Sequence, residues 1–374
     1  MRSPVVADGP AAADVTGGRS VAFAPGRVNL IGEHTDYNQG LALPFAITEG
    51  VVVRALGTSD AVVRVLARDL GERDEVSLGE PGRPDSERAR GGWRAYVRGI
   101  VAELLATGLD LPGAELEISG TVPAGAGLSS SAALELALAL ALRALAGEPP
   151  PCTGADRIAL ARLCSRVENE WVGAQTGLLD QLASLFGAEG MALRIDFRSL
   201  EVEQVTLALG DWRLVTLDSG EPHALAESGY NRRRTECAEA CAALGIGSLR
   251  DATLGMLGEL HDETLAARAR HVITENDRVR RAVTALQDGD LPELGRLLDA
   301  SHASLRDDYD VSTAAVERAV AVLLEAGAAG ARVIGGGFGG HVLGLMPPGV
   351  SAPEGAFAVR PGPGARLLQA RREG

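Results

Sequence analysis

The sequence predicts an α+β protein built from two lobes, and three observations support this fold class. A chain of 374 residues is too long for one ordinary hydrophobic core. Strand-like patterns recur through the first 220 or so residues, whereas long helical periodicities dominate beyond Leu225. We expect the two α+β lobes to meet near residues 190–220.

The first part of the chain is expected to alternate strands with helices. Residues 1–18 are rich in Ala, Gly and Pro and are predicted to form a disordered tail. After them, apolar runs or alternation predict strands, and amphipathic or apolar helical periodicity predicts helices. The expected strands are 20–24, 51–56, 61–68, 114–120 and 191–197, and the expected helices are 93–108, 128–146, 156–172 and 178–186.

The second part is expected to be mainly helical. A strand at 212–218 is followed by helical periodicity from 225 to 304, a break at RDDYDVS and a helix at 313–326. A glycine cluster, a strand at 341–346 and a short Arg-rich helix complete the chain. We therefore predict two domains, 19–200 and 201–374.

Composition excludes several classes of function. The net charge is −14, and no basic run offsets it, so we expect neither nucleic acid nor an anionic membrane as a partner. All 36 basic residues are arginines. Walker-A ATPases and protein kinases place a lysine on the nucleotide phosphates, so both classes are excluded. Any bound phosphate must be met by Arg, backbone N–H groups and metal.

Cysteine usage and the apolar segments indicate a cytoplasmic protein. The four cysteines form no CxxC pair and are expected to be reduced core residues; they are Cys152, Cys164, Cys237 and Cys241. The N-terminal segment lacks the apolar stretch of a signal peptide. The apolar run 128–146 contains Glu135 and Arg143, so it is predicted to be a buried helix and not a membrane span.

The segment TVPAGAGLSSSAALELALALAL (121–142) permits two interpretations. Its small residues lead into a helix that begins with the three serines Ser129 to Ser131, where backbone N–H groups and the helix dipole favour an anion. A serine hydroxyl there can also coordinate Mg²⁺ on a bound phosphate. The alternative is a serine-capped core helix without a ligand.

The segment APGRVNLIGEHTDYNQG (24–40) concentrates polar side chains between two apolar strands. Arg27, Glu33, His34 and Asp36 lie within ten residues, beside several glycines. Their spacing matches no common zinc pattern. Such a set of donors and acceptors suits a polyhydroxylated ligand, although a hydrogen-bonded Ω-loop would need a similar set.

Two further segments carry candidate groups. In VENEWVGAQTGLLDQLASLFG (167–187), Glu168 falls among apolar helix positions, where a carboxylate needs a metal or cation. Asp180, near a helix start, is a candidate general base, or an acid that only complements the helix dipole. In ARVIGGGFGGHVLGL (331–345), the glycines indicate a tight hairpin or a backbone wall against a ligand.

Together, these four segments resemble the signature motifs of the GHMP kinases, and among them of the galactokinases. The similarity extends to GGWRAYVRGIV, LDSGEPHALAESGYNRRRTECAEA and SHASLRDDYDVS, and so covers roughly residues 20 to 345. It implies a two-lobed GHMP-kinase fold, with a ribosomal-S5-domain-2-like first lobe, a ferredoxin-like second lobe and the active site between them. It also implies a monomeric cytoplasmic enzyme that uses ATP and Mg²⁺ to phosphorylate the C1 hydroxyl of D-galactose in the Leloir pathway.

The resemblance implies a role for each matching residue. Asp180 corresponds to the catalytic carboxylate at the C1 hydroxyl, and Arg27 lies beside it and counters the charge of the transferring phosphoryl group. The positions that hold the sugar are matched by Glu33, His34, Asp36, Tyr230 and Gly177. Trp93 matches an aromatic residue near adenine, and the triphosphate loop is matched by Gly125, Ala126, Gly127, Leu128, Ser129, Ser130 and Ser131. Ser131 and Glu168 match the Mg²⁺ positions.

The sequence also departs from the family pattern. The cysteine after the third glycine motif is His341 here, and the threonine before it is Ile334. A helix expected before the first strand and another between the last two strands are both curtailed, which predicts an exposed sheet face in the second lobe. Two other functions remain: a kinase for N-acetylgalactosamine, arabinose or galacturonate, and a non-catalytic galactokinase-like sensor.

Overall fold

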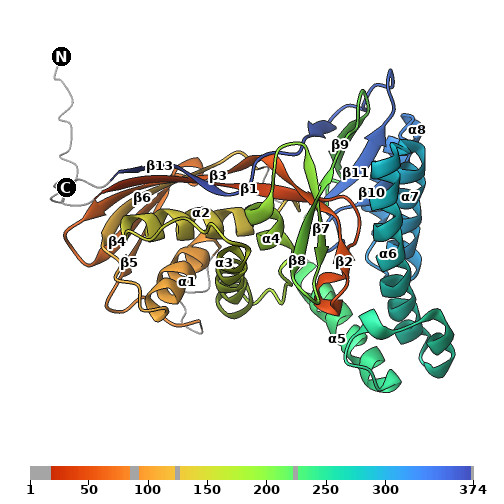
Figure 1. Ribbon diagram of the computed structural model, residues 1–374, viewed down its shortest axis with the longest axis horizontal. Coiled ribbons are helices and arrows are strands. Elements are labelled where there is room, and N and C mark those ends of the chain that lie inside the picture. The colour runs from red at the N-terminus through yellow and green to blue at the C-terminus, as the bar shows by residue number, and fades with distance from the viewer. Residues whose placement is uncertain (1–17, 85–91, 123–126, 222–225, 372–374) are drawn as a thin grey trace, which may run out of the picture.

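The computed structural model describes residues 18–84, 92–122, 127–221 and 226–371. Its elements divide between a strand-rich first lobe and a second lobe in which long helices flank a smaller sheet (Figure 1). The expected tail, residues 1–18, falls outside the described residues except for Gly18. Among the described residues, no helix combines the length and apolar character that crossing a membrane requires.

A six-stranded sheet forms the backbone of the first lobe, in the order β13-β1-β3-β6-β4-β5. Its strands are β1 (Arg19–Asn29), β3 (Pro44–Thr58), β4 (Val62–Ala67), β5 (Glu72–Ser77), β6 (Gly113–Gly120) and β13 (Arg366–Arg371). All neighbours are antiparallel except β4 and β6. The β1–β3 register shifts between Pro25 and Arg27. Such irregularities re-aim side chains next to active sites, and this one adjoins Arg27.

Helices cover one face of this sheet (Figure 1). They are α1 (Trp93–Ala106), α2 (Ser130–Leu145), α3 (Gly154–Arg166) and α4 (Leu179–Phe186). Residues 132–142 of α2 are all buried, as expected of a helix that is apolar on every side. The buried α2 therefore fixes the position of the serines at its N-terminus.

The second lobe combines a four-stranded sheet, in the order β10-β11-β9-β12, with four long helices. The strands are β9 (Arg213–Asp218), β10 (Ala331–Val333), β11 (His341–Met346) and β12 (Phe357–Val359). The helices are α5 (Ala226–Leu244), α6 (Glu263–Asp288), α7 (Leu291–Asp307) and α8 (Ala314–Glu325). A three-stranded sheet lies between the lobes; its strands are β2 (Leu41–Ala42), β7 (Met191–Asp196) and β8 (Glu201–Thr206).

The structure corrects several expectations. The closing helix was wrong, because residues 366–371 form β13, which pairs with β1 at the edge of the first sheet. The chain therefore returns to the first lobe after the second. The single helix expected at 156–172 is interrupted, since Val167–Val172 forms a π-helical turn. The exposed sheet face is not observed at β11, where all six residues are buried.

Candidate active site

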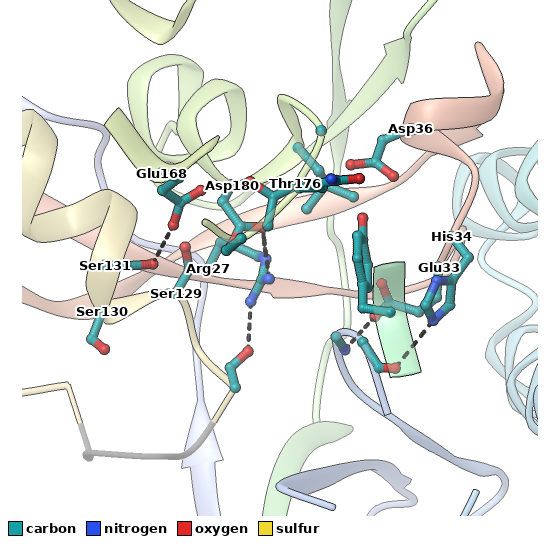
Figure 2. Close-up of a pocket in the computed structure, with 18 of the residues that line it drawn as sticks. Arg27, Glu33, His34, Asp36, Ser129, Ser130, Ser131, Glu168, Thr176 and Asp180 are labelled. Carbon is teal, nitrogen blue, oxygen red and sulfur yellow. Dashed lines mark hydrogen bonds and ion pairs between the residues drawn. The ribbon is translucent and has the colours of Figure 1, made fainter. Parts of the chain in front are cut away.

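A cavity of about 320 Å³ lies between the lobes and is lined by residues from both. Its first-lobe wall includes Arg27 on β1, the serines at the start of α2 and Asp180 in the first turn of α4. Tyr230 on α5 and the glycine turn after β10 contribute the second-lobe wall. Figure 2 shows Arg27 and Asp180 in the middle of this cavity. Glu168 and the serines lie on one side of the pair, and Glu33, His34 and Asp36 lie on the other.

Arg27 and Asp180 form an ion pair in the middle of the cavity. Two guanidinium nitrogens of Arg27, Nε and Nη2, lie 2.7 Å and 2.6 Å from Asp180 Oδ1. The third, Nη1, donates to the carbonyl oxygen of Gly127 at 2.6 Å. Both contacts to the carboxylate end on Oδ1, so Oδ2 is the oxygen that can accept a proton from a ligand hydroxyl.

The buried carboxylate of Glu168 is the centre of a hydrogen-bonded cluster beside this pair. The π-helical turn carries Glu168, and single π-turns often occur at functional sites. Ser131 Oγ donates to Oε1 at 2.7 Å, while Thr176 Oγ1 and Gln181 Nε2 donate to Oε2 at 2.8 Å and 2.9 Å. Burial, and then the charge of Asp180, raise the pKa of Glu168.

The Ser131–Glu168 pair fits the donor set that Mg²⁺ prefers. Mg²⁺ takes hard oxygen ligands and is often held by one or two carboxylates together with substrate phosphates. A cation at this point would relieve the unfavourable burial of the Glu168 carboxylate. The described residues hold no cluster of three His, Cys, Asp or Glu that could bind a metal without help from a ligand.

The start of α2 presents strained and unpaired groups to the same side of the cavity. Ser129 has φ +62° and ψ +48°, a left-handed conformation that non-glycine residues rarely adopt. Its buried hydroxyl has no hydrogen-bond partner in the structure. Gly127, Ser130 and Ser131 also line the cavity, whereas the Leu128 side chain is buried in the core and its carbonyl accepts from the Arg27 N–H. Gly125 and Ala126 lie outside the described residues.

The opposite side of the cavity gathers the five residues that match sugar-binding positions; they are Glu33, His34, Asp36, Gly177 and Tyr230. Burial, with the nearby charges of Asp180 and Glu33, raises the pKa of Asp36 to about 6. A Cβ on Gly177 would clash with the Asp36 carboxylate, so any larger residue there requires that carboxylate to shift. Glu33 Oε1 accepts from the N–H of Gly335 at 2.8 Å and lies 3.0 Å from Nη2 of Arg332.

Trp93 does not line this cavity. Its indole N–H donates to Glu72 Oε2 at 2.8 Å, and the guanidinium of Arg94 stacks 4.8 Å from its ring centre. Tyr96, one turn further along α1, lines the cavity instead. A contact of Trp93 with adenine therefore stays a prediction.

Comparison with known proteins identifies the family. Three protein-family models match the chain: the galactokinase galactose-binding signature at residues 14–55, the GHMP kinases N terminal domain at 95–188 and the GHMP kinases C terminal domain at 282–361. A galactokinase of Mycobacterium tuberculosis is 44% identical over 329 residues, which cover 87% of this chain and 88% of that protein. The chain belongs to the galactokinase family.

Solved structures agree with this assignment. A Lactococcus lactis galactokinase complexed with galactose is 34% identical, with a TM-score of 0.84, and the match covers 94% of this chain and 95% of that one. The mevalonate kinase of Methanococcus jannaschii, at 17% identity and a TM-score of 0.63, covers 91% of this chain and 98% of its own. That likeness shows the shared GHMP-kinase fold alone.

In this member of the galactokinase family, several residues that line the cavity or support its walls carried no signal of their own in the sequence. Thr176 and Gln181 complete the Glu168 cluster, yet both read as ordinary polar residues beside a helix start. Arg332 lies on β10 within an apolar strand and is fully buried. Its position between Ala331 and Val333 was the available signal, because an arginine within an apolar strand is expected to be buried and then needs a charged partner.

Proposed function

We propose that this chain catalyses ATP-dependent phosphorylation of the C1 hydroxyl of D-galactose, giving galactose 1-phosphate and ADP. The observation that carries the proposal is the position of the Arg27–Asp180 pair between the serine and Glu168 cluster and the sugar-side residues. Membership of the galactokinase family supports the same reaction.

The geometry supports the following mechanism. With Oδ1 of Asp180 held by Arg27, Oδ2 accepts the proton of the C1 hydroxyl as that oxygen attacks the γ-phosphorus of ATP. The bond from the γ-phosphorus to the β–γ bridging oxygen breaks, and ADP leaves. Arg27 remains beside the reacting atoms, where its charge favours the transferring phosphoryl group.

The triphosphate is proposed to lie at the start of α2. Backbone N–H groups there, the helix dipole and the unpaired hydroxyl of Ser129 all favour an anion. Ser131 and Glu168 would hold Mg²⁺, which, when bound, neutralises charge on the phosphates. This arrangement needs no lysine, consistent with a chain that contains none.

The sugar is proposed to lie between Asp36, Glu33 and Tyr230. Asp36 and Glu33 each offer a carboxylate oxygen to a sugar hydroxyl, and Glu33 does so with Oε2, because Oε1 already accepts from Gly335. The side chain of Tyr230 supplies an apolar ring against one face of the sugar. The close fit of Gly177 against Asp36 then fixes the position of the Asp36 carboxylate.

A coupled ADP-release assay over galactose, N-acetylgalactosamine, arabinose and galacturonate tests this proposal. We expect the highest kcat/KM with galactose. A higher value for another sugar would assign the chain to a sister kinase. Galactose binding without ADP release would make it a sensor. The intact Arg27–Asp180 pair favours turnover over sensing. A monomeric state and a cytoplasmic location stay predictions, which light scattering and cell fractionation would test.

A further inference from the structure

A chain of hydrogen bonds leads from the sugar side of the cavity into the second lobe. The carbonyl oxygen of Gly336 lies 3.2 Å from His34 Nε2, and His34 Nδ1 lies 2.8 Å from the hydroxyl of Tyr37. That hydroxyl is 2.9 Å from the hydroxyl of Tyr309, which in turn is 3.0 Å from Cys237 Sγ. These hydrogen bonds therefore join four segments that are distant in sequence: the sugar-side loop, α5, the residues after α7 and the glycine turn after β10.

The Gly336 end of this hydrogen-bond chain determines which group is the donor in each of its hydrogen bonds. A backbone carbonyl only accepts, so His34 Nε2 must carry the hydrogen. Burial, as the largest cause, lowers the pKa of His34 well below its usual value, so the ring is neutral and Nδ1 accepts from Tyr37. Since each hydroxyl has one proton, Tyr37 accepts from Tyr309, and Tyr309 accepts from the Cys237 thiol.

The contacts of Cys237, at the far end of the hydrogen-bond chain, are consistent with this order of donors. Asn38 Nδ2 donates to Cys237 Sγ at 3.5 Å and to the carbonyl of His34 at 2.9 Å. Burial raises the pKa of the Cys237 thiol to about 11 and raises the pKa values of Tyr37 and Tyr309 well above normal. All three groups therefore keep their protons at neutral pH, and the order of donors is fixed.

This order leaves His34 without a nitrogen for the ligand. Its ring lines the cavity and lies 5.2 Å from the Tyr230 ring and 4.7 Å from the Tyr309 ring, measured between centres. His34 also has φ +60°, a left-handed conformation that is uncommon for residues other than glycine. Both ring nitrogens of His34 are therefore used within the protein, one against Gly336 and the other against Tyr37.

We propose that the Tyr37–Tyr309–Cys237 chain is a positioning device that holds His34 as its Nε2–H tautomer and ties it to Gly336. In this role, His34 and Tyr37 shape the sugar pocket without donating a hydrogen bond to the sugar. The effect on sugar binding rests on the proposed sugar-kinase function, whereas the tautomer of His34 does not depend on it.

The tautomer is tested first, on the ligand-free full chain labelled with ¹⁵N. A long-range ¹H–¹⁵N correlation spectrum distinguishes protonated from unprotonated ring nitrogens, and the chain has only six histidines. The His34 signals are assigned by their loss in His34→Gln. We expect a protonated Nε2 and an unprotonated Nδ1. A protonated Nδ1, or a ring protonated at both nitrogens at pH 7, overturns the proposal.

Kinetics then test the positioning role. Loss of one neutral hydrogen bond in Tyr37→Phe should raise the KM for galactose about two- to tenfold, with the KM for ATP and kcat changed less than about twofold. Cys237→Ser keeps a donor to Tyr309 and should resemble the wild type, whereas Cys237→Ala should show a smaller rise than Tyr37→Phe. An unchanged galactose KM in Tyr37→Phe overturns the role.

Two controls separate the possible failures. Thermal unfolding shows whether each variant is folded, and Tyr309→Phe, one link further from His34, carries the kinetic test if Tyr37→Phe does not fold. An unchanged galactose KM in that variant also overturns the role. If the wild type does not phosphorylate galactose, the proposed function fails. The ¹⁵N spectrum still shows whether His34 is the Nε2–H tautomer that the hydrogen-bond chain requires.

Discussion

The two sides of the cavity hold their polar groups in opposite ways. On the phosphate side, Asp180 is paired with Arg27, whereas the buried carboxylates of Glu168 and Glu135 both accept from the uncharged Gln181 amide. Burial, as the largest cause, raises the pKa values of Glu168 and Glu135, so it is costly to keep these two carboxylates ionised there without a cation. Every contact of the Glu168 cluster lies within the first lobe.

The sugar side is instead joined across both lobes before any ligand binds. Glu33 receives the Gly335 N–H and lies beside Arg332, and His34 bonds to Gly336 and Tyr37. We infer from this difference that the phosphate side needs a bound cation to be complete, whereas the sugar side is already organised. Substitutions on the phosphate side should therefore alter turnover and metal dependence, and those on the sugar side should alter sugar affinity.

Asp180→Asn should give the largest effect. The amide cannot accept the proton of the C1 hydroxyl, so we expect kcat to fall by about 10²- to 10⁴-fold. ATP affinity, measured by calorimetry, should change little, because Asp180 contacts Arg27 and not the start of α2. Near-normal ADP release by this variant would contradict the assignment of Asp180 as the base.

Glu168→Gln tests whether the phosphate side needs a cation. Loss of an outer-shell partner weakens metal binding by about 10- to 100-fold, and loss of a direct ligand should weaken it at least as much. We expect the Mg²⁺ concentration for half-maximal turnover to rise accordingly, with the galactose KM unchanged. The matched control is Glu170→Gln, in the same π-helical turn but exposed. Equal Mg²⁺ dependence in the two variants would remove Glu168 as a ligand.

Local sequence patterns predicted the elements whose form is decided locally. Helix α2 was predicted from its apolar run and α8 from its periodicity, and both lie within two residues of the expected bounds. The strand β13 was predicted as a helix because Ala, Leu, Gln and Arg favour helices. Its actual form depends on pairing with β1, some 350 residues earlier, which no local pattern reveals.

The same limit applies to the site. Arg27, Asp180 and Glu168 were singled out because charged groups beside glycines or among apolar residues are conspicuous. The chain through Tyr37, Tyr309 and Cys237 was not predicted, because it forms only when segments about 200 and 270 residues apart in sequence meet. Cys237 was predicted to be a reduced core residue, and it is buried and forms no disulfide, whereas the same prediction for Cys152 was wrong, because Cys152 is exposed. The hydrogen bond between Cys237 and Tyr309 could not be predicted from composition.

Gly177→Ala tests how closely the sugar side is fitted. An added methyl group would collide with the Asp36 carboxylate, which must then move from its present position. Displacement of a binding group by about 1 Å is costly, so we expect the galactose KM to rise about tenfold or more with little change in the Mg²⁺ requirement. Gly154→Ala is the control, because a Cβ there meets nothing within 4 Å. A wild-type galactose KM in Gly177→Ala would show that Asp36 can shift freely.

The smallest expected effect is the response of the sugar side to pH. The pKa of Asp36 is raised to about 6, so its carboxylate gains a proton and loses an acceptor as the pH falls through 6. Because kcat/KM reports groups of the free enzyme, kcat/KM for galactose should fall about fourfold between pH 7 and pH 5.5. In Asp36→Asn, kcat/KM for galactose should be lower than in the wild type and should vary less between pH 7 and pH 5.5. If the variant and the wild type lose activity in parallel, the titrating group lies elsewhere, and Asp36 is ionised throughout.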